Sequence, residues 1–204
     1  MRLRTMTASA ATAVALVGLT ATAAQAYTTY TPSGGPSLDL IGSTISFADT
    51  TASYPLGTCT TFDLVGSITS PGISRAYPAS VGTLAPSISD CPITANATNL
   101  SITADAAAGT TLWPAQLDNV AITYNTVGCT FTAGGGAAGR AATISGTFDT
   151  SRRTFTATAS TLDINAGSVA GVCFLYGISA GDAVGIGVGA SWTNIGSTLS
   201  ITNP

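Results

Sequence analysis

The chain contains no histidine, no lysine and no glutamate. A Ser-His-Asp triad requires histidine, and Ser-Lys or Schiff-base chemistry requires lysine, so neither mechanism is available. The ionisable acids and bases that remain are mainly nine aspartates and six arginines. We therefore predict a protein that is not an enzyme, with no catalytic residue and no cofactor.

Positive charge and long apolar runs are scarce as well. Arg2 and Arg4 precede a short apolar run at residues 11–19 and a small-x-small site ending at Ala26, which predicts a secretory signal over residues 1–26. No later segment has the roughly 20 apolar residues of a membrane helix, so we expect no membrane span. The four remaining arginines face nine aspartates and form no basic patch, which excludes a nucleic-acid partner.

Cysteine is present in a small, even number. In an exported chain, four cysteines predict two disulfides rather than free thiols. Zinc is the alternative, but the chain has no CxxC pair and no histidine, so we predict no metal site. Three connectivities are open, and we favour the sequential one, in which each half of the chain closes its own loop. It joins Cys59 to Cys91 and Cys129 to Cys173.

The chain after the signal predicts an all-β fold, because β-branched residues are dense and charged helix formers are few. About nine short strands with regular turn residues are typical of an antiparallel β-sandwich or a closed barrel, and both stay open. The candidate strands are residues 38–47, 58–69, 99–103, 120–126, 129–132, 141–149, 153–160, 172–178 and 183–193. We expect residues 27–36 to be a flexible lead-in and residues 37–204 to be a single β domain.

The clearest alternation predicts a hairpin of residues 141–149 and 153–160 with hydroxyls on one face and apolar side chains on the other. Regularly spaced threonines on a flat face could match an ordered surface such as a polysaccharide, a crystal or ice. The plainer interpretation is that threonine simply suits a solvent-facing strand. The candidate surface-binding residues are Thr143, Thr147, Thr154, Thr156 and Thr158, with Trp113 as the exposed aromatic because it precedes Pro114 in an irregular stretch.

The last candidate strand alternates aliphatic residues with glycine. We assign its aliphatic face to the core, and this face comprises Val184, Ile186, Val188, Ala190 and Trp192. The glycines match the letters of a dinucleotide-binding G-x-G-x-x-A motif, but they lie within a strand and no acidic residue follows. Glycines on a strand face more often allow another backbone to approach closely.

Two Asp-Thr motifs, at Asp49 and Asp149, are similar to the paired carboxylates of aspartic proteases. Those enzymes need glycine as the third residue, whereas Thr51 and Ser151 stand there in this chain. Asp149 is better explained as the first residue of a hairpin turn.

Several features together resemble a group of small secreted actinobacterial proteins of unknown function. They are the strand leading to Cys59, the Ser-Ile-Ser-Asp sequence before Cys91, the Val-Gly-Cys129-Thr-Phe sequence, the Phe-Asp-Thr hairpin, and the Ala-Gly-Asp182-Ala and Ser-Thr-Leu-Ser-Ile-Thr sequences near the end. Members are described as hypothetical exported or signal-sequence-domain proteins, and some are similar to so-called alkane-oxidation activator proteins. The resemblance implies a secreted β fold and no catalytic residue.

These observations predict a non-enzymatic secreted or cell-surface protein with a structural, adhesive or surface-interaction role, whose partner could be a cell-wall polysaccharide. The alternative is an extracellular carrier that binds a hydrophobic small molecule between two sheets. An aspartate-dependent hydrolase is a third, weaker hypothesis. Low charge and exposed strand edges also predict weak self-association.

Overall fold

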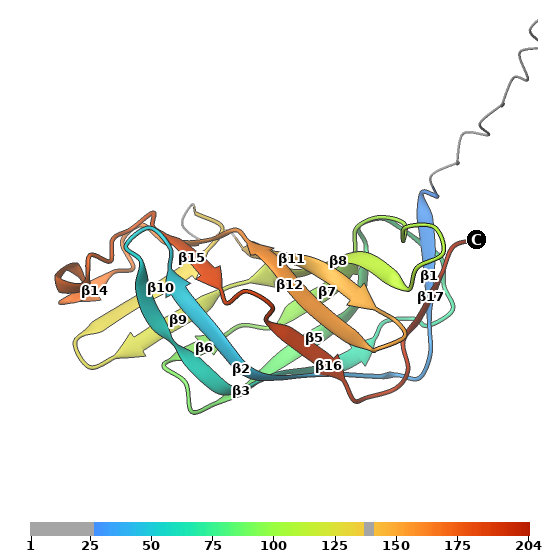
Figure 1. Ribbon diagram of the computed structural model, residues 1–204, viewed down its shortest axis with the longest axis horizontal. Coiled ribbons are helices and arrows are strands. Elements are labelled where there is room, and N and C mark those ends of the chain that lie inside the picture. Colours follow the sequence, from blue (N-terminus) through green and yellow to red (C-terminus); the bar gives the residue numbers. More distant parts are fainter. Residues whose placement is uncertain (1–26, 137–140) are drawn as a thin grey trace, which may run out of the picture.

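Eight antiparallel strands close into a barrel in the computed structural model, which describes residues 27–136 and 141–204 (Figure 1). In order around the barrel they are β2 (Ser37–Asp49), β3 (Tyr54–Ile68), β5 (Ser80–Ser89), β7 (Thr98–Ile102), β8 (Leu112–Val120), β11 (Ala142–Asp149), β12 (Thr154–Ser160) and β16 (Ser191–Asn194). The ring is closed because β16 pairs with β12 on one side and with β2 on the other. Of the two predicted all-β architectures, the closed barrel is therefore the one that forms, while the predicted signal segment lies outside the described residues.

Side chains from all eight strands fill the barrel. Trp192 lies among them with 1% of its surface exposed, its ring 6.1 Å from that of Phe62 and 5.9 Å from that of Phe155. Gly42 of β2 makes room for the indole, because a Cβ there would lie 2.5 Å from Nε1 of Trp192. The void lined by Phe62, Leu117 and Trp192 has a volume of about 10 Å³, which holds no more than one water molecule.

Strands β2 and β3 continue beyond the barrel, where the same sheet extends into a further part that we call the distal sheet. The end of β2 pairs with β15 (Ala183–Ile186), and β13 (Leu162–Ile164), β10 (Cys129–Gly134), β9 (Ile122–Thr126) and β6 (Ile93–Ala95) follow in that order. The short strand β14 (Ala170–Gly171) pairs with β10 and leads into a single 3₁₀ turn, η1 (Cys173–Tyr176). No helix in the described ranges is long and apolar enough to cross a membrane.

Both disulfides lie in the distal sheet. Cys59 of β3 is bonded to Cys91 just before β6, and Cys129 of β10 is bonded to Cys173 at the start of η1. The sequential pairing is therefore confirmed. The first bond ties β3 to the outermost strand of the distal sheet, and the second ties η1 to β10. Two disulfides indicate an oxidising environment such as the outside of the cell.

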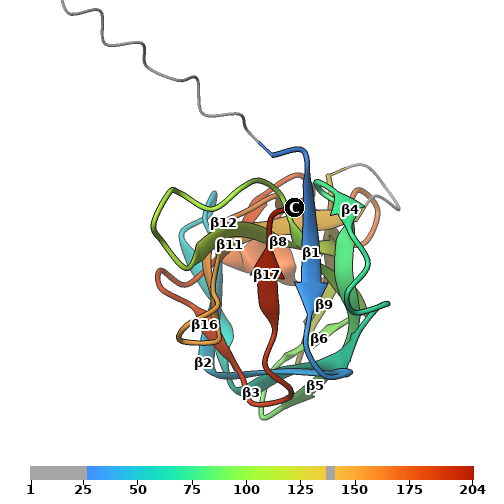
Figure 2. The same cartoon turned by 90° about the vertical axis from the view of Figure 1, so that its right-hand side faces the viewer.

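A small three-stranded sheet covers the other end of the barrel (Figure 2). It consists of β1 (Thr29–Ser33), β4 (Arg75–Ala76) and β17 (Ser200–Thr202). Tyr30 of β1 is fully buried, stacks on Tyr77 with 5.2 Å between ring centroids, and donates its hydroxyl hydrogen to the carbonyl of Ala79. This burial raises the pKa of Tyr30 to about 12. The prediction of a flexible lead-in over residues 27–36 is wrong, because β1 closes the barrel end.

Two of the predicted strands are also wrong. Residues 183–193 form β15 and β16 with a turn between them, in which the Ala190 N–H donates to the Gly187 carbonyl over 3.0 Å. This turn carries the chain from the distal sheet to the barrel, so Val188 is fully exposed instead of joining the core. Residues 172–178 contain η1 rather than a strand. Of the eight barrel strands, β5 and β8 were not predicted, and the short strands β1, β4, β6, β13, β14 and β17 were not predicted either.

Candidate functional site

The predicted hydroxyl face lies on the outer wall of the barrel, on the β11–β12 hairpin. Thr147 pairs with Thr156 across the hairpin, and Thr156 pairs in turn with Ser191 of β16, so these three hydroxyl residues form a row across three strands. The next pair on the same face of these strands is Thr154 with Thr193, two residues along β12. Because the sheet closes on itself, this face is curved rather than flat as the surface-matching idea assumed.

A bulge divides the remaining predicted residues from this row. The register between β11 and β12 shifts at Ser145 and Gly146, which leaves Thr158 without a partner in β11. The Thr158 hydroxyl donates to the Ser145 carbonyl over 3.2 Å, and the Thr143 hydroxyl lies 3.3 Å from that of Thr161. Within residues 27–136 and 141–204, the hydroxyls of Thr147 and Thr156 have no hydrogen-bond partner and remain available to a ligand.

Trp113 is not an exposed aromatic. Only 6% of its surface is exposed, and it pairs with Phe148 across β8 and β11. Trp113, Ala115 and Leu117 alternate along β8 with their side chains in the barrel. The prediction failed because the proline that follows Trp113 was taken as a sign of irregular structure, although this proline lies within the strand.

A cleft opens beside the hydroxyl row where the barrel and the distal sheet separate. Strand β12 pairs with β16 only as far as Thr156, while β15 has turned away to pair with β2 and β13. The space between them has a volume of about 590 Å³ and is lined by residues 156–160, residues 183–189 and Thr50. Thr156 and Thr158 therefore share a cleft with the glycine-rich strand that follows them in the chain by some 30 residues.

A second hollow of about 330 Å³ lies on the other side of the glycine-rich segment. The glycines allow β15 and the following turn to lie close to β2, because a Cβ at Gly187 would lie 2.1 Å from Oγ of Ser46 and one at Gly185 would lie 2.6 Å from Thr50. The glycine face is therefore closely approached, as expected, but the nearest atoms at Gly185 and Gly187 belong to the side chains of Thr50 and Ser46 rather than to another backbone. Val188 stands between the two hollows, and the side chains that line both are uncharged.

The two Asp-Thr motifs occupy separate turns and do not form a carboxylate pair with each other. Asp149 accepts hydrogen bonds from the Ser151 hydroxyl over 2.7 Å, from the Thr111 hydroxyl over 2.8 Å and from the Ser151 N–H over 2.9 Å. These donors lower the pKa of Asp149 to about 2. The interpretation of Asp149 as a turn residue is thus supported by its contacts.

Asp49 is fully buried at the end of β2 and faces a different aspartate. Its Oδ1 accepts the N–H groups of Thr51 over 2.9 Å and Ala52 over 2.8 Å, while its buried Oδ2 has no partner among the described residues. Burial raises the pKa of Asp49, and the nearby Asp182 carboxylate, which could accept a hydrogen bond from the protonated form, adds to this. Sequence reasoning missed this pair because Asp182 lies in the turn before β15, far along the chain.

Replacing Asp49 by asparagine should raise the Tm at pH 7 by about 2 to 4 °C, which corresponds to about 1 kcal/mol for a chain of this size. The amide keeps the Oδ1 acceptor and supplies a donor toward Asp182. In the wild type, the folded-state pKa of Asp49 exceeds the unfolded value of 3.8, so stability should fall as the pH rises from about 4 through the folded pKa. Thermal unfolding between pH 4 and pH 8 measures this, and the Tm of Asp49→Asn should fall less over this range than the Tm of the wild type.

For Asp149→Asn we expect the opposite change in Tm at pH 7, a decrease. Because the folded-state pKa of Asp149 is lowered to about 2, its contribution is present above about pH 4 and is lost as the pH falls toward 2. This variant should therefore be less stable than the wild type at pH 7. A lower Tm for Asp49→Asn at pH 7 would contradict the assignment of a raised pKa to Asp49.

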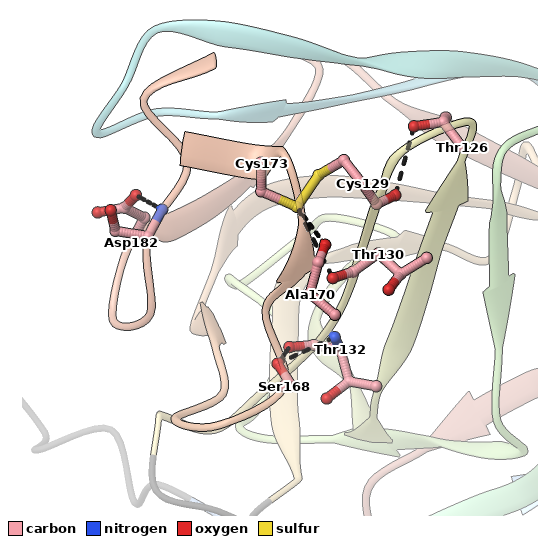
Figure 3. Close-up of a disulfide and its surroundings, with 9 residues drawn as sticks. Thr126, Cys129, Thr130, Thr132, Ser168, Ala170, Cys173 and Asp182 are labelled. Carbon is pink, nitrogen blue, oxygen red and sulfur yellow. Dashed lines mark hydrogen bonds between the residues drawn. A yellow bond between two sulfur atoms is a disulfide. The ribbon is translucent and has the colours of Figure 1, made fainter. Parts of the chain in front are cut away.

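The distal sheet carries an exposed group of apolar side chains beside the second disulfide. Figure 3 shows the Cys129–Cys173 bond, with the carbonyl oxygen of Ala170 lying 3.2 Å from Sγ of Cys173. The Ser168 hydroxyl donates to the carbonyl of Thr132 over 3.1 Å and holds the preceding loop against β10. We call the exposed group the apolar tip, and it consists of Val127, Val172, Phe174, Leu175 and Tyr176. Sequence reasoning missed it by assigning residues 172–178 to a strand.

Neither the arrangement of metal-ligating side chains among the described residues nor the comparisons with known proteins indicate a further site. Within the ranges that the structure describes, no three cysteine, histidine or acidic side chains lie together in a way that could hold a metal ion. No family model, curated protein or solved structure matches the chain.

Proposed function

We propose that this protein is a non-enzymatic secreted or cell-surface protein that acts through its outer surface, in a structural, adhesive or surface-interaction role. The observation that carries the proposal is the row of Thr147, Thr156 and Ser191 beside the 590 Å³ cleft. Hydroxyls without internal partners can exchange hydrogen bonds with a hydroxyl-rich ligand, and an uncharged lining suits a neutral one. A neutral cell-wall polysaccharide is the partner that best fits this chemistry.

The filled barrel supports a surface role over a carrier that holds its ligand between sheets. The void beside Trp192 and Phe62 measures about 10 Å³, whereas small-molecule sites usually measure about 300 to 1,000 Å³. A rigid, packed barrel is a suitable scaffold for a fixed array of surface groups.

Substituting Thr156 by tyrosine should weaken binding to insoluble cell-wall polysaccharide by about tenfold or more, because the ring would block both the hydroxyl row and the cleft. Co-sedimentation of the purified protein with cell-wall material measures this binding. Ser87→Tyr is the matched control, since Ser87 is an exposed hydroxyl residue on β5 in another part of the barrel wall. Equal binding by Thr156→Tyr and the wild type would end the proposal for this face.

The cleft also supports a second candidate function, a carrier that binds a small molecule at the surface. Its volume of about 590 Å³ falls in the range of ligand sites, and Ala157, Val184 and Ile186 give it apolar walls. Native mass spectrometry of protein taken directly from the culture medium should then show a retained ligand. This ligand should be lost in Thr156→Tyr and kept in Ser87→Tyr.

A further inference from the structure

The apolar tip exposes large apolar side chains where a folded chain usually buries them. Phe174 is 69% exposed, Leu175 is 67% exposed and Val127 is fully exposed, and Val172 and Tyr176 flank them. Figure 1 places η1 at the end of the long axis opposite the barrel end where β1 and β17 lie. A contiguous exposed apolar group of this kind marks an interaction site more often than a single exposed residue does.

The covalent and hydrogen-bonded framework beneath the tip fixes its backbone. Cys173 is fully buried and bonded to Cys129, while the residues on either side of it point outward. The Val172 N–H donates to the Gly128 carbonyl over 2.5 Å, and the Gly177 N–H donates to the Phe174 carbonyl over 3.1 Å. The side chains are thus presented in advance, which lowers the entropy cost of binding.

Contacts with neighbouring turns join the exposed side chains into one surface. The rings of Tyr176 and Tyr54 lie 5.0 Å apart, which brings η1 against the start of β3. A Cβ at Gly128 would lie 3.1 Å from Cγ2 of Val172, so the β9–β10 turn that carries Val127 adjoins η1.

The charge around the tip argues against an anionic partner. The arginines of the described residues lie elsewhere, with Arg75 in β4 at the capped barrel end and Arg152 and Arg153 in the β11–β12 turn. The turn that follows η1 instead carries an acid, Asp182, which accepts the Ser179 N–H over 2.6 Å. Attraction to anionic lipid headgroups depends on lysine and arginine near the surface, so the tip fits an uncharged partner.

The area of the tip is too small for a stable protein interface. A full aromatic side chain buries up to about 250 Å², so Phe174 and Tyr176 at their observed exposures of 69% and 41% offer at most about 275 Å² together. Three aliphatic side chains do not raise this to the roughly 800 Å² per partner of a standard interface. Insertion into a fluid apolar phase has no such minimum area and no need for shape complementarity.

We propose that the apolar tip inserts into the acyl-chain boundary of an uncharged lipid surface and anchors the protein there with its barrel directed away. Phe174 and Leu175 enter the apolar layer, and Tyr176 lies at the headgroup level, where its hydroxyl stays hydrated. The barrel face that carries Thr147 and Thr156 is then free to engage a second surface. The inference rests on the tip alone and does not require the polysaccharide-binding function.

Flotation with phosphatidylcholine vesicles tests this proposal on the exported protein. The wild type should float with the vesicles, and Phe174→Ser/Leu175→Ser should reduce the bound fraction at least about tenfold. Val127→Ser, in a different turn, should cause a smaller loss. Ile195→Ser is the matched control with unchanged binding, because Ile195 is 67% exposed like Leu175 but lies between β16 and β17. Unchanged tryptophan fluorescence from the barrel confirms that each variant is folded.

Three outcomes would overturn the proposal. The first is that the wild type does not float with the vesicles. The second is that the double variant floats to the same extent as the wild type. The third is binding that requires phosphatidylglycerol and disappears with added salt, because this would show recognition by charge. If the double substitution instead abolishes self-association in sedimentation while phosphatidylcholine binds neither protein, the tip is a protein interface. The result of the Thr156→Tyr binding test does not change the conclusion drawn from any of these outcomes.

Discussion

Replacement of Trp192 by alanine should lower the free energy of unfolding by about 4 kcal/mol or more. Trp192 is 1% exposed and packs between the rings of Phe62 and Phe155 at the centre of the barrel. Removing a buried tryptophan typically costs about 3 to 5 kcal/mol. The side chain's contacts are lost, and in addition a cavity remains that the surrounding side chains fill only partly. A barrel closed by hydrogen bonds on every side has little freedom to collapse around the space, which places this site in the upper part of that range.

A hydrogen bond adds to the packing loss at the same position. The indole N–H of Trp192 donates to the buried carbonyl of Phe62 over 2.8 Å. Alanine leaves that carbonyl without its donor, and a buried unsatisfied group costs about 1 to 3 kcal/mol. Trp192→Phe also loses this bond but keeps most of the side-chain volume, so it should cost clearly less than Trp192→Ala.

Equilibrium unfolding in guanidinium chloride, monitored by circular dichroism, measures both variants. Phe174→Ala is the control, because an exposed aromatic should change the free energy of unfolding by no more than about 0.5 kcal/mol. If Trp192→Ala were no more destabilising than this control, the barrel core would not be organised around Trp192 as described.

Local pattern was sufficient to predict some of these features. The β11–β12 hairpin was predicted because its alternation and its turn lie within 20 consecutive residues, and the structure places Thr147 opposite Thr156 and Phe148 opposite Phe155. The disulfide pairing was predicted because closing two separate loops is the simplest arrangement for four widely spaced cysteines. In the first case the deciding information lies within one short segment, and in the second each bond joins a cysteine to the next one along the chain.

Features that depend on distant partners were not predicted. Tyr30 is buried because β4 and the residues after it, more than 40 positions along the chain, pair with β1 and pack against its ring, while β17 from the far end of the chain pairs with the rest of β1. Val188 is exposed because the turn between β15 and β16 carries the chain from one part of the large sheet to another, although the alternation runs through both strands without interruption. A period of two shows which residues share a face, but it does not show where the sheet ends.

The candidate sites follow the same division. Thr156 was predicted as a surface residue from the alternation in its own strand. The cleft beside it depends on β15, which was predicted as part of one long strand with its aliphatic face in the core. The apolar tip was missed because residues 172–178 have the composition of a buried strand. The segment instead forms the 3₁₀ turn η1, which begins at the buried, disulfide-bonded Cys173, ends at Gly177 with a φ of 76°, and leaves Phe174 and Leu175 exposed.

Replacing Cys59 and Cys91 together by alanine should lower the free energy of unfolding by about 3 to 4 kcal/mol. In the chain-entropy model this is the stabilisation expected from a bond that closes a loop over a sequence separation of 32 residues. Substituting both cysteines avoids a free thiol that could form wrong disulfides. Denaturant unfolding under non-reducing conditions measures the change.

The loss should be concentrated at one edge of the distal sheet. Strand β6 is the outermost strand, and among the described residues it pairs with β9 alone, through three residues, so the Cys59–Cys91 disulfide is the cross-link that holds it to β3. Hydrogen exchange in the double variant should accelerate first at residues 93–95 and 122–126, while amides around Trp192 keep their protection. Cys129→Ala/Cys173→Ala should instead release η1 and abolish vesicle binding, with β6 still protected. Uniform acceleration in both variants would contradict this division, because it would mean that the distal sheet and the barrel unfold as one unit.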